Sequence, residues 1–240
     1  MKFDLQKQTD KAKFTIEKKG IPTSQKMAVV LNLDVSGSAQ GLYTSGTIQE
    51  LFESITPLAL NFDDNQSLQV FTFSSGSSSV SEITPDANAS NYAGYIKKNI
   101  LENRNVPKWG GTEYAPVLKA NLENLGYYKK SGLFGGKQLQ AKNDSGYPSF
   151  IITFTDGANQ DQYEVRRLLR EYQDKGVNAY FLYIGVGPSS YFTNIEELGE
   201  EFSNVGFVGV SNIQKFVDSD DIYDQLLPDE LIEWLKAARN

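Results

Sequence analysis

Apolar and polar residues follow one another along this chain in blocks that predict strands and helices in turn. Short apolar runs at 27–33, 149–155 and 178–186 predict strands that are buried on both faces, as in a parallel sheet covered by helices. Residues 68–74 alternate apolar and polar positions, which indicates a half-buried strand, and 206–210 predict a last short strand.

Segments with helical periodicity separate these strands. In residues 46–61, Ile48, Leu51, Phe52 and Ile55 fall on one face of a helix. Further helices are predicted at 91–103, 114–125, 161–175, 192–202 and 220–239. Strands that alternate with helices predict an α/β fold: a doubly wound, mostly parallel sheet with helices on both faces.

The first 26 residues precede the first predicted core strand, so we divide the chain into an N-terminal extension, 1–26, and a domain, 27–240. Phe14-Thr15-Ile16 alternates enough to suggest a short strand, which Gly20-Ile21-Pro22 ends. We expect the extension to pack on the edge of the main sheet. A mobile arm is the alternative that the sequence leaves open.

Charge is distributed unevenly along the chain. Residues 1–26 contain seven Lys and three acidic residues, whereas 191–240 contain eleven acidic and three basic residues. These are either solvated surfaces or a docking patch. The net charge of −7 argues against nucleic acid and anionic membranes as partners, since both would repel the protein.

Composition removes several kinds of active site. The chain contains neither Cys nor His, which disfavours disulfides, thiol nucleophiles, zinc sites and catalytic triads. The first seven residues carry charges where a signal peptide needs an apolar core, and the apolar runs are too short to span a bilayer. We therefore expect a cytoplasmic protein. Its oligomeric state does not follow from the sequence.

The candidate chemistry begins directly after the first apolar run. Asp34-Val35-Ser36-Gly37-Ser38 offers a carboxylate at a strand end and two hydroxyls at alternate positions of a turn. Three hard oxygen donors close together suit a divalent cation such as Mg²⁺. Ordinary turn and capping chemistry also explains such residues when the motif stands alone.

Two later stretches strengthen the metal-site interpretation. Trp109-Gly110-Gly111-Thr112 carries a hydroxyl on a tight loop, and Thr155-Asp156-Gly157 carries a second carboxylate at the end of another apolar strand. In parallel sheets ligands collect beyond the carboxyl ends of the strands, where both Asp34 and Asp156 are expected.

In this order the motifs resemble the metal-ion-dependent adhesion site (MIDAS) of von Willebrand factor A (vWA) domains, whose fold is Rossmann-like. The resemblance implies a metal site formed by Asp34, Ser36, Ser38, Thr112 and Asp156, with Asp156 acting through water. It implies Mg²⁺ as the ion, with Mn²⁺ or Ca²⁺ as alternatives. It also implies a partner protein that presents an Asp or Glu to the ion.

A narrower resemblance is carried by Phe62-Asp63-Asp64, by 91–95, by Gly110–Val117 and by the ending 222–239. These segments are similar to the adhesion-type domains of bacterial tellurium-resistance and stress-response proteins. That resemblance implies a metal-dependent interaction module and not an enzyme. The alternative is a metal-dependent phosphoryl-transfer or hydrolytic enzyme, because an open Mg²⁺ site can polarise a phosphate.

Overall fold

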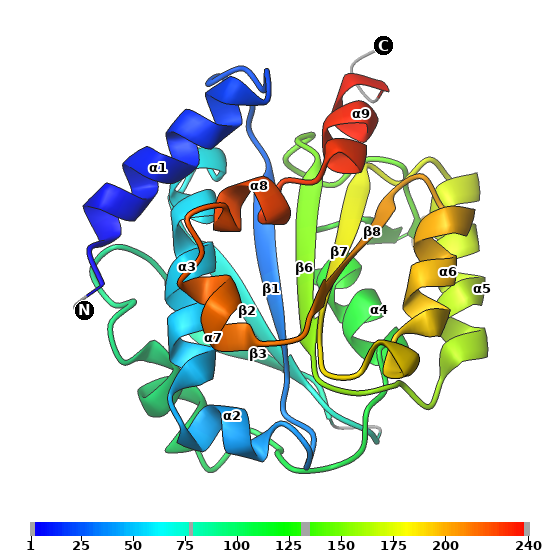
Figure 1. The fold of residues 1–240 in the computed structure, drawn as a ribbon. Coiled ribbons are helices and arrows are strands. Elements are labelled where there is room, and N and C mark those ends of the chain that lie inside the picture. Colours follow the sequence, from blue (N-terminus) through cyan, green and yellow to red (C-terminus); the bar gives the residue numbers. More distant parts are fainter. Residues whose placement is uncertain (1–2, 77–78, 131–134, 238–240) are drawn as a thin grey trace.

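The computed structural model describes residues 3–76, 79–130 and 135–237. Within these residues a six-stranded sheet with the order β3-β2-β1-β6-β7-β8 lies between two layers of helices (Figure 1). Every neighbouring pair is parallel except β2 and β3. The strands are β1 (Ala28–Asp34), β2 (Leu68–Phe73), β3 (Ser81–Ala87), β6 (Ser149–Thr155), β7 (Ala179–Val186) and β8 (Val205–Val210). The predicted doubly wound, mostly parallel α/β fold is therefore confirmed.

The register of the central strands sets the position of their ends. β1 pairs with β2 on one side and β6 on the other, and Leu33 lies opposite Phe154. Asp34 and Thr155 consequently end their strands side by side. Nearly every residue of β1, β6 and β7 is buried, as the apolar runs predict.

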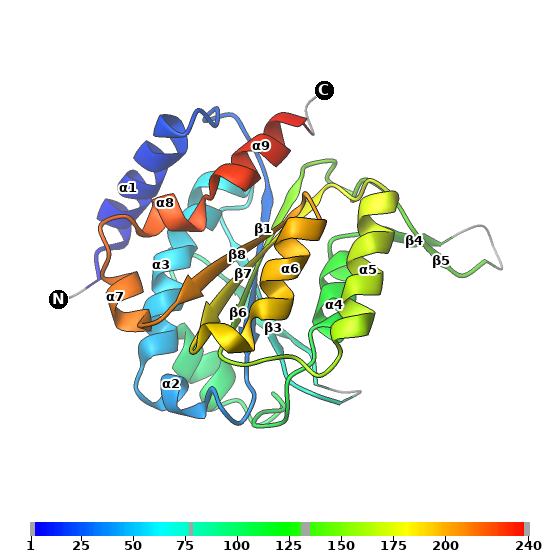
Figure 2. The same ribbon diagram turned by 45° about the vertical axis from the view of Figure 1, so that its right-hand side comes forward.

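Two apolar cores lie on the two faces of the sheet. Figures 1 and 2 show the helices of the first face on the opposite side of the sheet from those of the second. The first face is covered by α2 (Gln40–Thr44), α3 (Thr47–Phe62), α7 (Ile213–Val217), α8 (Ile222–Leu226) and α9 (Asp229–Ala237). The second is covered by α4 (Ala115–Asn124), α5 (Gln162–Asp174) and α6 (Thr193–Glu201).

The N-terminal segment differs from the predicted short strand, since Leu5–Lys18 forms helix α1. The Asp4 side chain caps this helix by accepting a hydrogen bond from Lys7 N. Ala12 and Ile16, one helical turn apart, are buried, and α1 packs on α3 rather than on an edge strand (Figure 1). The division of the chain at residues 26 and 27 stays a prediction.

Two lysines of α1, and Lys19 directly after it, face acidic residues near the end of the chain. Lys11, Lys18 and Lys19 pair with Asp220, Asp224 and Asp229 at 3.1, 3.6 and 3.0 Å, respectively. Some of the N-terminal positive charges and C-terminal negative charges thus pair with one another within the molecule. Because these carboxylates are exposed or half-exposed, the pairs contribute little stability individually.

Three other elements also differ from the predictions. The helix expected at 91–103 is only a π-helical turn, Lys97–Leu101. The helix expected at 220–239 is two helices, α8 and α9, because Pro228 disfavours a helical Leu227 before it; residues 238–240 lie outside the described part. Strand β3, at the sheet edge, was not predicted, and its Pro85 is tolerated there.

Tyr128–Lys130 (β4) and Lys137–Leu139 (β5) form a separate two-stranded hairpin that projects from the second face, clearly seen in Figure 2. A 3₁₀ turn, Ser189–Tyr191, precedes α6. None of the helices in the described ranges combines the length and the apolar character needed to cross a bilayer.

Candidate metal centre

The candidate site lies at the carboxyl edge of the sheet, where β1 and β6 end next to one another. Asp34 is the last residue of β1, and Asp156 directly follows β6. Their side chains arrive at the same edge because the strands are parallel neighbours in register.

Four of the five predicted ligands are joined by hydrogen bonds. Ser36 N donates to Asp34 Oδ1 at 2.7 Å, and the Ser36 and Ser38 hydroxyl oxygens are 3.1 Å apart. Ser38 Oγ donates to Asp156 Oδ1 at 2.8 Å. These four residues therefore form one continuous series of hydrogen-bonded groups, from Asp34 to Asp156.

Thr112 reaches this edge through its loop. Ser36 forms a β-bridge with Gly110, and Gly37 N donates to the Gly110 carbonyl oxygen at 2.9 Å. Gln160 N donates to the Thr112 carbonyl oxygen at 2.9 Å, so the loop after Asp156 also contacts it. Thr112 is buried, and its hydroxyl forms no hydrogen bond with any residue that the structure describes. That hydroxyl is thus not occupied by another described group of the protein.

Glycine suits the point where the loop approaches its neighbours. A Cβ on Gly111 would lie 2.9 Å from Ser75 Oγ, closer than real Cβ contacts, and 3.1 Å from Gln160 Oε1, which is tighter than most of them. Gly111 N uses this close approach to donate to Ser75 Oγ at 2.8 Å. The Gly-Gly pair therefore lets the Thr112 loop lie against the rim.

Two residues that the sequence interpretation missed support Asp34 from behind. Thr155 Oγ1 donates to Asp34 Oδ2 at 2.7 Å. The Tyr114 hydroxyl lies 3.0 Å from Thr155 Oγ1 and 2.7 Å from the Gly157 carbonyl oxygen. Both oxygens of Asp34 are thus fixed by protein donors. Thr155 precedes a candidate ligand in sequence, but nothing in the sequence indicates that Tyr114 turns inward.

Burial makes the charge on the two carboxylates unfavourable. Asp34 is fully buried, and this burial raises its pKa to about 6, although hydrogen bonds from Ser36 and Thr155 lower it and the charge of Asp156 raises it. The pKa of Asp156 is also raised, mainly by burial, while the Ser38 hydroxyl lowers it. None of the ion pairs among the described residues involves either carboxylate.

The donor chemistry fits a Mg²⁺-type ion. Within the described part of the chain no three His, Cys, Asp or Glu side chains gather, so the donors are two carboxylates and hydroxyls. Hard oxygen donors with few carboxylates are what Mg²⁺ uses in proteins, and a cation would offset the unpaired negative charge at this rim.

Comparison with known proteins identifies the family. Residues 26–240 match the family model vWA-TerF-like, described as the vWA domain found in the TerF C terminus. The chain belongs to this family. The predicted vWA relationship is thereby confirmed, while the metal-binding role of the five residues stays a prediction.

The vWA-TerF-like chain also has a relative of similar length. It is 30% identical to the uncharacterized protein YcbR of Bacillus subtilis (strain 168) over 238 residues, which are 99% of this chain and 88% of that protein. That relative's name carries no functional information, so it extends the family without assigning an activity.

Solved structures resemble the chain in fold. A structure of proximal thread matrix protein 1 from the mussel byssus, with a zinc-occupied MIDAS motif, matches with a TM-score of 0.51 and 17% identity over 88% of this chain. This chain covers 50% of that one. The SpRpn10 VWA domain matches with a TM-score of 0.51 and 11% identity, over 80% of this chain and 93% of that one. At these identities the matches support the vWA fold alone.

Proposed function

We propose that this protein is a metal-dependent protein-interaction module. Asp34, Ser36, Ser38, Thr112 and Asp156 would hold a divalent ion of the Mg²⁺ type, with Mn²⁺ or Ca²⁺ as alternatives. The observation that carries the proposal is the hydrogen-bonded run from Asp34 through Ser36 and Ser38 to Asp156 at one edge of the sheet.

The charge of the donor set favours an acidic partner. The two carboxylates neutralise the charge of a divalent ion without making the site negative. A bound ion could therefore still accept an anionic oxygen at a free coordination position. Asp34 is fully buried whereas Asp156 is half-buried, so the exposed part of the site lies at Asp156. We propose that an Asp or Glu of a partner protein binds there.

The biological setting belongs to the same proposal. The family description names TerF, and the Bacillus subtilis relative supports a bacterial origin. Together with the motif resemblance these support a role in a bacterial tellurium-resistance or stress-response system, inside the cytoplasm.

The competing proposal is a metal-dependent phosphoryl-transfer or hydrolytic enzyme. It has less support, because a phosphoaspartate-forming enzyme of the Asp-x-Asp type would need a carboxylate where Ser36 stands. The sequence also contains no His or Cys for acid, base or nucleophilic chemistry.

Metal titration of the purified protein tests the proposal. Mg²⁺, Mn²⁺ and Ca²⁺ are titrated by calorimetry into the wild type, Asp34→Ala and the control Asp63→Ala, which changes an Asp in the turn after α3. We expect binding in the wild type and the control, and its loss in Asp34→Ala. Absence of binding in the wild type would contradict the proposal.

Two further assays separate the module from the enzyme. Phosphate release from generic phosphoesters is measured with each metal, and bacterial proteins are captured on the immobilised wild type with Mg²⁺ or with EDTA. If the protein is an interaction module, we expect no phosphate release. We also expect a bacterial protein that the wild type captures with Mg²⁺ but not with EDTA, and that Asp34→Ala does not capture. Turnover that disappears in Asp34→Ala would favour the enzyme.

A further inference from the structure

Helix α4, which directly follows the Thr112 loop, has no capping side chain of its own. Tyr114 occupies its N-cap position and makes no side-chain capping bond. The first four N–H groups of a helix have no partner within it, and Pro116 has no N–H, so Tyr114 N and Ala115 N are among the three donors at this helix start that need one, together with Val117 N. An acceptor for them must come from elsewhere in the chain.

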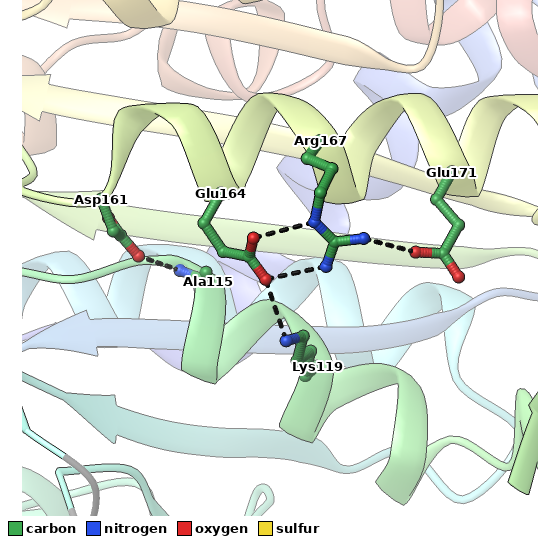
Figure 3. Close-up of polar contacts among 6 residues, drawn as sticks. All are labelled: Ala115, Lys119, Asp161, Glu164, Arg167 and Glu171. Carbon is green, nitrogen blue, oxygen red and sulfur yellow. Dashed lines mark hydrogen bonds and ion pairs between the residues drawn. The ribbon is translucent and has the colours of Figure 1, made fainter.

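That acceptor is Asp161, 46 residues beyond Ala115. Asp161 Oδ1 accepts from Tyr114 N at 3.1 Å, and Oδ2 accepts from Ala115 N at 2.7 Å. Figure 3 shows the Asp161 side chain extending from the start of α5 to the α4 backbone at Ala115. Asn159 Nδ2 fixes the same carboxylate by donating to Oδ1 at 2.8 Å.

Asp161 does not cap its own helix, α5. It stands at the N-cap position of α5, where an Asp ordinarily caps its own helix, yet its side chain makes no capping bond to α5. Because Asp161 bonds to the backbone of α4 and not to its own helix, it joins two segments that are distant in sequence.

Both segments carry candidate ligands. Thr112 lies two residues before Tyr114, and Asp156 lies five residues before Asp161. The neighbouring bond from Gln160 N to the Thr112 carbonyl oxygen, at 2.9 Å, joins the same two segments. Side-chain and backbone bonds thus tie the Thr112 loop to the loop that follows Asp156.

We infer that Asp161 is a positioning residue of the candidate metal centre. It holds the start of α4, and therefore Thr112, against the segment that carries Asp156, so that both donors reach the ion together. This inference rests on the proposed function. Residues that orient ligands in this way typically change metal affinity by roughly 10- to 100-fold when they are replaced.

The chain offers matched variants for the test. Asp161→Ala removes both acceptors, and Asp161→Asn keeps one oxygen in nearly the same shape. Glu164→Gln is the control, because Glu164 also joins α5 to α4, through Lys119 at 3.1 Å, but one turn farther from the metal centre (Figure 3).

Two measurements are made on each variant of the 240-residue chain: Mn²⁺ affinity by calorimetry, and amide hydrogen exchange of Tyr114 and Ala115 by NMR in EDTA. For Asp161→Ala we expect roughly 10- to 100-fold weaker Mn²⁺ binding and at least about tenfold faster exchange of the two amides. Asp161→Asn should recover part of both effects, and Glu164→Gln should change neither.

The outcomes distinguish this inference from the proposed function. If the wild type binds Mn²⁺ and Asp161→Ala binds it equally well, the inference is wrong and the proposed function stands. If the wild type binds no divalent ion, the proposed function fails and the metal part of the inference fails with it. The exchange rates in EDTA then still decide whether Asp161 holds the loop, and unchanged rates would reject that as well.

Discussion

The two faces of the sheet are held by different kinds of contact. On the first face, α3 buries ten of its 16 residues, because it lies between the sheet and α1. On the second face, α5 buries four of its 13 residues and uses its polar side for contacts with α4 and α6. Helix α3 is thus held mainly by apolar volume, whereas α5 also makes directed polar bonds to the helices beside it.

This difference bears on the metal centre, which lies at the edge where the two faces meet. On the second face, Asp161 bonds to the start of α4 next to the centre. Farther along α5, Glu164, Arg167 and Glu171 form ion pairs with one another and with Lys119 of α4 (Figure 3). Polar contacts can be altered singly without emptying a core. The second face is therefore where the position of the site can be tuned while the fold persists.

The largest effect is expected from the apolar face. Phe52 is fully buried in α3 and stacks on Tyr95, with ring centroids 4.9 Å apart. Phe52→Ala should lower the free energy of unfolding by about 3–5 kcal/mol, because it leaves a cavity in a packed core. Urea denaturation measures this change.

The matched control for Phe52 is Tyr163→Ala, which truncates an aromatic residue of α5 that is 83% exposed. Its effect should stay within about 0.5 kcal/mol. Equal losses for the two variants would show that burial in the α3 core does not set the effect of removing an aromatic side chain.

A smaller effect is expected from the buried polar contact beneath α4. Asn32 and Asn121 exchange two hydrogen bonds, of 2.8 and 3.0 Å, and Asn32 also donates to Thr153 Oγ1 at 3.0 Å. Asn121→Ala should lower the free energy of unfolding by about 1–3 kcal/mol, since it leaves buried polar atoms of Asn32 unpaired.

A double-mutant cycle with Asn32→Ala sharpens this prediction. Once Asn32 is also removed, no amide remains to be left unpaired, so the double variant should lose less stability than the sum of the single variants. Additive losses in thermal or urea denaturation would mean that the two amides do not depend on each other.

At the metal centre we expect the affinity for Mn²⁺ to fall about tenfold for each unit by which the pH lies below the pKa of Asp34. Burial holds the pKa of Asp34 at about 6, and a metal ligand must be ionised. The Mn²⁺ association constant should therefore rise with pH up to about 6 and level off above it, as calorimetry between pH 5 and 7.5 can measure.

The sign for stability runs the other way in the metal-free protein. Because the pKa of Asp34 is raised on folding, the folded state binds its proton more tightly than the unfolded state. The contribution of Asp34 to stability should thus decline as pH rises from about 4 to 6, and saturating Mn²⁺ should reverse that decline. A pH-independent Mn²⁺ affinity would contradict the raised pKa.

The smallest effect is expected from the exposed charges of α5. Arg167→Gln removes the ion pairs to Glu164 and Glu171, of 2.8 and 3.3 Å. All three side chains are more than a third exposed, so the free energy of unfolding should fall only slightly, and by less still at high salt. A loss as large as that of Phe52→Ala would overturn the comparison.

The sequence predicted the fold class because apolar runs and helical periodicity are local properties of the chain. One failure occurred where distant contacts override local preference, and another was a local proline effect that periodicity does not include. Phe14-Thr15-Ile16 alternates like a strand, but it is helical because α1 buries Ala12 and Ile16 against the α3 side. Pro228 divides the terminal helix that periodicity alone suggested.

The sequence alone indicated which side chains carry the candidate chemistry and that Asp34 and Asp156 come at the ends of two apolar strands. The folded structure adds that the two strands are parallel neighbours, that Thr155 and Tyr114 lie behind Asp34, and that Asp161 caps α4 instead of its own helix. Strand ends follow from the local pattern of apolar residues, whereas strand pairing does not. The partner of a buried hydrogen-bonding group depends on which distant segment packs beside it.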